Sequence, residues 1–151
     1  LWQMVYFVLR EDSLSRFISI YLFTCAGGFF ASYLACIPFT LGASASICGF
    51  IGAIIYYGKS RGGFYGEMIY RQAMGWVVGL AVFGFIIPGI NNWAHGGGLL
   101  SGILLSHLLG YEERRNETLF HRTLALTAIV GTILIIAWAL AQTFFAMTNM
   151  A

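Results

Sequence analysis

Two short segments contain the residue types from which a serine hydrolase is built. Residues 42–53 read GASASICGFIGA and include Ser44, and residues 91–102 read NNWAHGGGLLSG and include His95. A serine hydroxyl is a weak nucleophile at neutral pH and needs an adjacent base. Histidine, with a reference pKa of ~6.5, can serve as that base. The two segments therefore suggest Ser44 as nucleophile and His95 as base, if the fold brings them together.

Other side chains compete for these roles. Ser46 and Ser101 could partner His95 on spacing alone. A serine in a membrane helix also often bonds a backbone carbonyl, so a structural polar contact between packed helices remains an alternative to a catalytic pair. Two further histidines are expected near the membrane surface instead, one at the end of an apolar segment and one in a basic loop: His107 and His121.

The composition indicates which solvent surrounds these segments. Of the 151 residues, 59% are hydrophobic and 9% are charged, whereas soluble domains carry about 25% charged residues. The chain is therefore expected to lie in a membrane. The net charge of +2 gives no reason to expect a nucleic-acid partner. The three cysteines lie in apolar stretches without a CxxC or Cys/His cluster, so neither a metal nor another cofactor is expected.

The positions of the apolar runs predict an all-α, polytopic transmembrane bundle. A membrane-spanning helix needs ~20 mostly apolar residues, and apolar residues on all faces favour helices, which satisfy every backbone polar group internally. A short apolar run at the start of the chain resembles the last two turns of a further helix. The predicted helices cover residues 17–37, 41–57, 72–90, 94–110 and 123–147, and the partial one covers 1–9.

The basic residues predict which side of the membrane each loop faces. If the loops alternate between sides, all eight fall on one side, and the positive-inside rule makes that side cytoplasmic. Ser44 and His95 then begin inward-running helices at the opposite face, at similar depth, and Ala151 is non-cytoplasmic. The eight basic residues are Arg10, Arg16, Lys59, Arg61, Arg71, Arg114, Arg115 and Arg122.

Small residues are expected to let the two helices approach each other closely. Ser44, Cys48 and Gly52 recur every four residues and share one face of their helix. Gly98 and Gly102 lie near the His95 face of the other helix. Small residues permit close approach of membrane helices, so these faces are expected to pack until the serine and histidine meet.

The same residues resemble the motifs of rhomboid intramembrane proteases. The tripeptide Gly42-Ala43-Ser44 opens a helix that also contains Gly49 and Gly52, and it is similar to the rhomboid Gly-x-Ser motif. Residues 92–95, Asn-Trp-Ala-His, with glycines at positions 97, 98 and 102, resemble the rhomboid histidine motif. The order of the motifs and the helix between them strengthen the resemblance, which covers residues 1–110.

The resemblance implies a bundle of six core helices plus a C-terminal seventh. Residues 1–110 would form the membrane core, from the end of its second helix to its sixth. Residues 111–122 would form a cytoplasmic loop, and residues 123–151 would contain the additional helix. The first core helix and most of the second would precede this chain. The implied location is a bacterial inner membrane.

The implied function is cleavage of transmembrane segments of other proteins by a Ser–His dyad. A triad is not expected, because the acidic residues lie in segments assigned to the cytoplasmic side. Ala45 replaces the glycine that usually follows the nucleophile, and Cys48 stands where some relatives have an aromatic residue. An alternative is a rhomboid-like protein that binds membrane helices without cutting them or belongs to a larger complex. A small transporter or channel subunit fits less well, because the polar groups collect at one depth.

Overall fold

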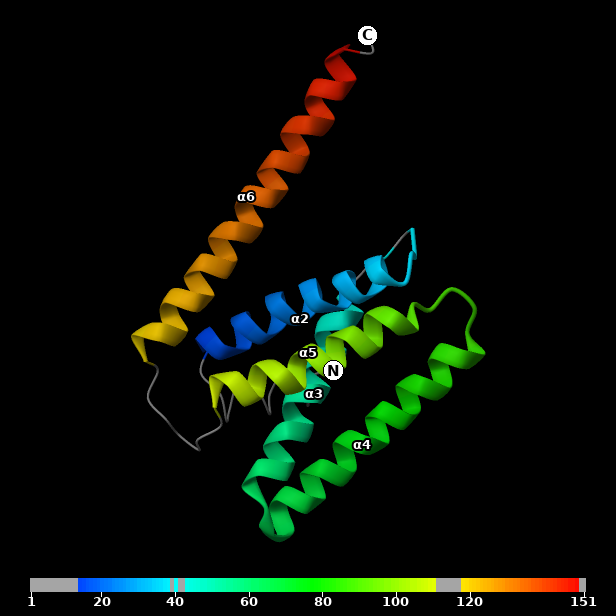
Figure 1. Cartoon of the computed structure of the whole chain (residues 1–151), viewed down its shortest axis with the longest axis vertical. Coiled ribbons are helices and arrows are strands. Elements are labelled where there is room, and N and C mark those ends of the chain that lie inside the picture. The colour runs from blue at the N-terminus through cyan, green and yellow to red at the C-terminus, as the bar shows by residue number, and fades with distance from the viewer. Residues whose placement is uncertain (1–13, 39, 41–42, 111–117, 150–151) are drawn as a thin grey trace.

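The computed structural model describes residues 14–38, 40, 43–110 and 118–149, and it confirms the predicted all-α fold for these residues (Figure 1). The predicted partial helix over residues 1–9 lies outside the described residues, as does Gly42. The helices are α2 (Leu14–Leu34), α3 (Ser44–Arg61), α4 (Gly63–Ile86), α5 (Asn92–Leu109) and α6 (Leu119–Asn149).

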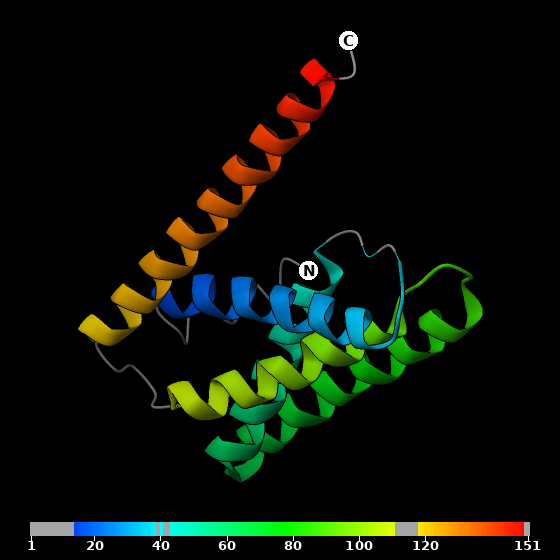
Figure 2. The ribbon, with the colours of Figure 1, turned by 45° about the horizontal axis from the view of Figure 1, so that its top comes forward.

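Helix α3 lies at the centre of the bundle, in contact with α2, α4 and α5 (Figures 1 and 2). Twelve of its 18 residues are buried. Length and composition alone would select α2, α4 and α6 as membrane-spanning helices, but not α3 or α5. The hydropathy of these two helices is lowered mainly by Lys59 and Arg61 in α3 and by Asn92, His95 and His107 in α5. Both helices also contain glycine and serine residues, which suit contacts between helices rather than contacts with lipid.

The predicted loop over residues 58–71 is wrong. Helix α3 continues to Arg61 and α4 begins at Gly63, so the connection is a single residue, Gly62. Gly62 and Gly63 have φ values of +64° and +65°, a region in which a side chain is strained and glycine is not. Two adjacent glycines therefore reverse the chain direction at once. The other predicted helix ends differ from the observed ones by up to about one turn.

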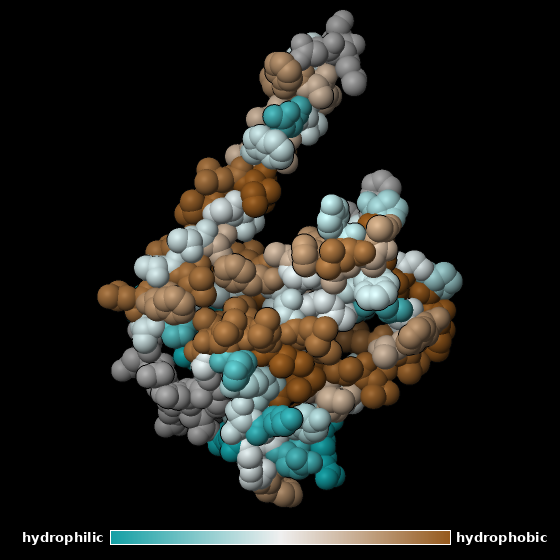
Figure 3. Space-filling view, viewed as in Figure 1, coloured by the Kyte–Doolittle hydropathy of each residue, from teal (hydrophilic) through white to brown (hydrophobic). Residues whose placement is uncertain are grey.

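The charged residues around this turn support the helices instead of ending them. Arg71 Nε forms an ion pair with Glu67 Oε1 at 2.8 Å, one turn away on α4. Arg61 Nη1 donates to the hydroxyl of Tyr57 at 2.6 Å, one turn back on α3. Pairs four residues apart stabilise exposed helices. Polar residues gather at the end of the molecule that this turn forms, while apolar residues cover much of the rest of the visible face (Figure 3).

Helix α6 packs on α2 near its own N-terminus and then diverges from the bundle (Figures 1 and 2). His121 and Ala125 are buried at this contact. Most later α6 side chains are exposed, and only 6% of the residues in its most apolar stretch are buried within the protein. A long apolar helix of this kind is suited to contact with lipid.

Candidate active site

Helices α3 and α5 run parallel and touch through their backbones. A Cβ atom placed on Gly98 would overlap the carbonyl oxygen of Ala45, and one placed on Gly102 would overlap that of Gly49. On the opposite side of the contact, a Cβ on Gly52 would overlap the carbonyl oxygen of Leu99. The glycines on each helix thus meet main-chain atoms of the other, and the N-terminal ends of the two helices lie at the same end of the bundle.

Ser44 and His95 lie in the first turns of these two helices. Ser44 is the first residue of α3, whose first backbone hydrogen bond runs from Ile47 N to Ala43 O at 3.1 Å. The N–H of Ser44 therefore has no carbonyl to bond within its own helix. In α5, His95 N donates to the carbonyl of Asn91 at 3.2 Å. The partial positive charge of both helix N-termini favours negative charge at this end of the bundle.

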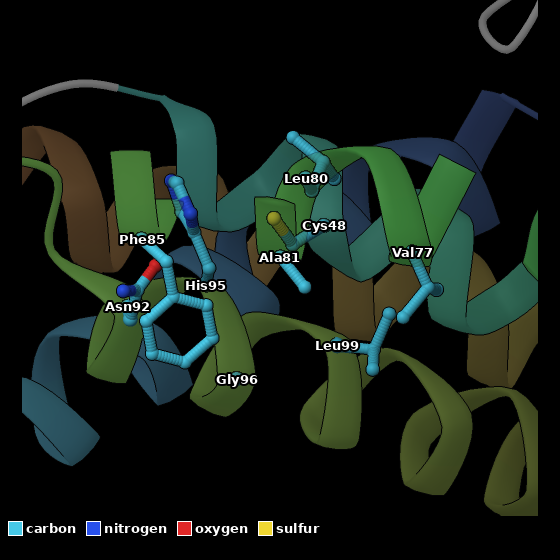
Figure 4. A pocket seen from close by; sticks show the side chains of 9 residues that line it. All are labelled: Cys48, Val77, Leu80, Ala81, Phe85, Asn92, His95, Gly96 and Leu99. Carbon is cyan, nitrogen blue, oxygen red and sulfur yellow. The ribbon is translucent and has the colours of Figure 1, made fainter. Parts of the chain in front are cut away.

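The imidazole of His95 borders a cavity of about 180 Å³ between α3, α4 and α5 (Figure 4). Its Nδ1 atom is buried and has no hydrogen-bond partner among the described residues. Cys48 contributes its side chain from α3. The other lining residues, most of them apolar and four of them from α4, are Val77, Leu80, Ala81, Phe85, Asn92, Gly96 and Leu99.

The competing serines face α2. Ser46 is fully buried, and its Oγ donates to the carbonyl of Tyr21 at 2.9 Å. Ser101 lies against Gly27, where a Cβ atom on the glycine would overlap its hydroxyl. Because each of these side chains packs on α2, neither is directed to the cavity beside His95.

The other histidines lie far along the chain from the first turn of α5. His107 is exposed near the opposite end of α5, with Nδ1 at 3.2 Å from the hydroxyl of Tyr56. His121 Nδ1 is hydrogen-bonded to Thr118 Oγ1 at the start of α6. His95 is thus the histidine that shares an end of the bundle with Ser44.

A sequence profile of the rhomboid domain matches residues 1–112 of the chain. The chain belongs to the rhomboid family. The rhomboid protease GluP of Bacillus subtilis (strain 168) is 31% identical over 110 residues, which cover 73% of this chain and 22% of the relative. The chain thus matches about a fifth of that relative's length. No solved structure matches the chain significantly.

Membership of the rhomboid family identifies the chain as an integral membrane protein from a family of intramembrane proteases. The two departures from the rhomboid motifs have distinct surroundings. Ala45 is 1% exposed, and its methyl group lies where a Cβ on Gly28 of α2 would be. The glycine on α2 therefore leaves room for it. Cys48 borders the cavity beside His95, where a larger side chain would find space.

No hydrogen bond joins Ser44 to His95 within the part of the chain that the structure describes. Catalytic hydrogen bonds are often long or poorly aligned in the absence of substrate and tighten in the substrate complex. The serine–histidine pairing thus stays a prediction, which rests on the shared end of two helices in backbone contact.

Sequence reasoning missed two contributions to this site. Helix α4 provides much of the cavity wall through apolar residues, which have no distinguishing motif. Asn92 Nδ2 donates to the carbonyl of Gly84 at 2.9 Å and ties the end of α4 to the start of α5. An asparagine next to a predicted helix start was the available signal, since side-chain amides are common at such ends.

Proposed function

We propose that this chain carries the catalytic pair of an intramembrane serine endopeptidase, with Ser44 as nucleophile and His95 as base. One observation carries the proposal. The parallel, glycine-mediated contact of α3 and α5 holds the two residues at the same end of adjoining helices. Beside His95 lies a mostly apolar cavity of about 180 Å³. Membership of the rhomboid family and the similarity to a rhomboid protease support the same function.

In the proposed reaction, Ser44 Oγ attacks the carbonyl carbon of the scissile peptide while the His95 ring takes its proton. Negative charge then develops on the carbonyl oxygen, and the Ser44 N–H, which has no intrahelical partner, is a donor for it. The protonated imidazole gives its proton to the leaving amine, which departs and leaves an acyl-enzyme. A water molecule, deprotonated by His95, hydrolyses the ester and regenerates the serine.

The proposed substrates are transmembrane segments of other membrane proteins. An apolar cavity wall suits side chains that come from the hydrocarbon phase. The proposed orientation places the α3–α4 turn in the cytoplasm and the start of α3 and α5 at the other face, because all eight basic residues then lie on the cytoplasmic side. The proposed location is a bacterial inner membrane.

The test is cleavage of a helical model substrate by the full-length protein in proteoliposomes. Ser44→Ala and His95→Ala are each expected to reduce turnover to background, because a serine without its base loses nearly all of its reactivity. The matched controls are Ser46→Ala and His107→Ala. Each removes the same functional group from a residue that faces α2 or lies at the other end of α5, so each is expected to retain activity.

The absence of a Ser44–His95 hydrogen bond also fits a rhomboid-like protein that binds membrane helices without cutting them, alone or in a larger complex. The same experiment distinguishes the two functions. A wild-type protein that captures the substrate helix but never cleaves it would support the binding function. Inactivity of Ser46→Ala together with full activity of Ser44→Ala would contradict the assignment of the nucleophile.

A further inference from the structure

The side chain and carbonyl of Asn91 hold the first turn of α5. Asn91 Oδ1 accepts a hydrogen bond from Ala94 N at 3.1 Å, and the Asn91 carbonyl accepts one from His95 N at 3.2 Å. The first of these bonds is an N-cap, which satisfies a backbone N–H that the helix itself leaves open. Asn91 therefore supplies the acceptor for two backbone N–H groups of this turn, those of Ala94 and His95.

The amide nitrogen of Asn91 bonds two other segments. It donates to Ser32 Oγ on α2 and to Thr40 Oγ1 in the connection from α2 to α3, both at 2.8 Å. Ser32 Oγ donates in turn to the carbonyl of Gly28 at 3.0 Å. Both hydrogens of the amide and its oxygen are thus engaged, and the three bonds reach three different segments. The end of α2 lies beside the start of α5 in both ribbon views (Figures 1 and 2).

The connection from α2 to α3 is tied to this network at Thr40. The N-cap residue of α3, Ala43, makes no side-chain hydrogen bond to the helix. Of the described residues between Ile37 and Ser44, Thr40 is the one whose side chain is hydrogen-bonded to another element. The connection before α3 is therefore tied at Thr40 to the same asparagine that begins the helix of His95, in addition to the contacts that Ala45 and Ser46 of α3 make with α2.

Close to this network, α2, α3 and α5 pack against one another at a glycine of α2. A Cβ atom on Gly28 would overlap the methyl group of Ala45 and would lie 2.7 Å from the carbonyl oxygen of Ala94. The helices α2, α3 and α5 consequently meet at Gly28, one turn before Ser32. The absence of a side chain at Gly28 lets the three helices approach this closely, and the Asn91 hydrogen bonds join the start of α5 to the end of α2 and to Thr40.

We propose that Asn91 is a positioning residue that sets the placement of Ser44 relative to His95. The proposal rests on the proposed proteolytic function. Asn91 touches neither the substrate nor the reacting atoms, and it acts through Thr40 on one side and through the first turn of α5 on the other. A nucleophile misplaced by ~1 Å can lose ~10²-fold in rate, so loss of this tie is expected to lower catalysis without removing either catalytic group.

Two substitutions separate alignment from simple helix capping. Asn91→Ser keeps a capping oxygen, but its side chain is too short to reach Ser32 and Thr40. Thr40→Val keeps the shape of the side chain and removes the hydroxyl that accepts from Asn91. Thr40→Ser restores that hydroxyl and is the rescue variant. Thr127→Val is the matched control, because the Thr127 hydroxyl donates to the carbonyl of Leu124 in its own helix and to no other element among the described residues.

The full-length variants are compared in proteoliposomes by kcat and KM for a helical substrate, by the rate of Ser44 labelling with a fluorophosphonate, and by Tm. Asn91→Ser and Thr40→Val are expected to lower kcat and the labelling rate by about tenfold or more, with KM near the wild-type value. Their Tm is expected to fall modestly, because each variant loses hydrogen bonds, but too little to account for the loss of kcat. Thr40→Ser and Thr127→Val are expected to match the wild type in all four.

Three outcomes would overturn the proposal. If Thr40→Val labels and cleaves like the wild type, Asn91 does not act through Thr40, although the proteolytic function would stand. If kcat falls only in proportion to a lower Tm, the network is merely structural. If the wild type neither cleaves nor labels at Ser44, the proteolytic function fails and the positioning role fails with it.

Discussion

Gly98 of α5 lies directly against the backbone of Ala45 on α3, so closely that a Cβ atom on the glycine would overlap the alanine carbonyl oxygen. This contact lies one residue from Ser44 along α3 and three residues from His95 along α5. The spacing of the two helices at the site therefore depends on the absence of a side chain at position 98.

Gly98→Ala is expected to destabilise the bundle by ~1–3 kcal/mol, because the added methyl group forces the two backbones apart in a region without free space. Gly96→Ala is the control on the same helix, since a Cβ at Gly96 meets no atom within 4 Å. Thermal unfolding in detergent measures both. Equal stability of the two variants would contradict the close contact.

The double variant Ser44→Ala/His95→Ala is expected to be about as inactive as either single variant. A nucleophile and its base act as one unit, so removal of the second member costs little once the first is gone. Residual turnover of the three variants in proteoliposomes measures this. If the losses multiplied, the two residues would act independently and would not form a dyad.

Ser46→Ala is expected to lower the free energy of unfolding by ~0.5–1.5 kcal/mol, because it removes the hydrogen bond to the carbonyl of Tyr21. Substrate cleavage is expected to persist at the assay temperature. Tm and turnover are measured on the same preparation. A loss of turnover at unchanged Tm would instead assign Ser46 a role in catalysis.

Cys48→Phe is expected to fold with a Tm close to that of the wild type, because the cavity of about 180 Å³ beside Cys48 can receive the ring. Ala45→Phe is the contrasting variant and is expected not to fold, since Ala45 is enclosed by Gly28 and Gly98. A Tm that falls as far in Cys48→Phe as in Ala45→Phe would show that the cavity is not available.

Single cysteines placed at Ser60 and Ala151 are expected to react from opposite sides of the membrane in a protein whose native cysteines are replaced by serine. The positive-inside rule places Ser60, between Lys59 and Arg61, in the cytoplasm. An impermeant maleimide applied to intact and to permeabilised spheroplasts measures the side. Labelling of both positions from the same side would contradict the proposed topology.

Local properties of the chain were enough to predict its class and most of its helices. The length and apolarity of α2, α4 and α6 follow from composition within each segment. The glycine-flanked serine and histidine were recognisable because their neighbours in sequence form the motifs. The α3–α4 connection was mispredicted because the basic and acidic side chains from Lys59 to Arg71 were interpreted as a loop. Instead, the Glu67–Arg71 ion pair on α4 and the Arg61–Tyr57 hydrogen bond on α3, each spanning one turn, are compatible with continuing helices.

By itself, the sequence determined that the chain lies in a membrane and that it is helical, and it predicted that Ser44 and His95 lie near the starts of two helices. The tertiary structure decided which hydroxyls face α2, that α4 lines the cavity beside His95, and that Asn91 joins three segments. The hydrogen bonds of Ser46 with Tyr21 and of Asn91 with Thr40 and Ser32 link residues separated by 25 to 59 positions in the chain. They depend on the rotation of each helix about its axis, which is set by the places where glycines allow neighbouring backbones to touch.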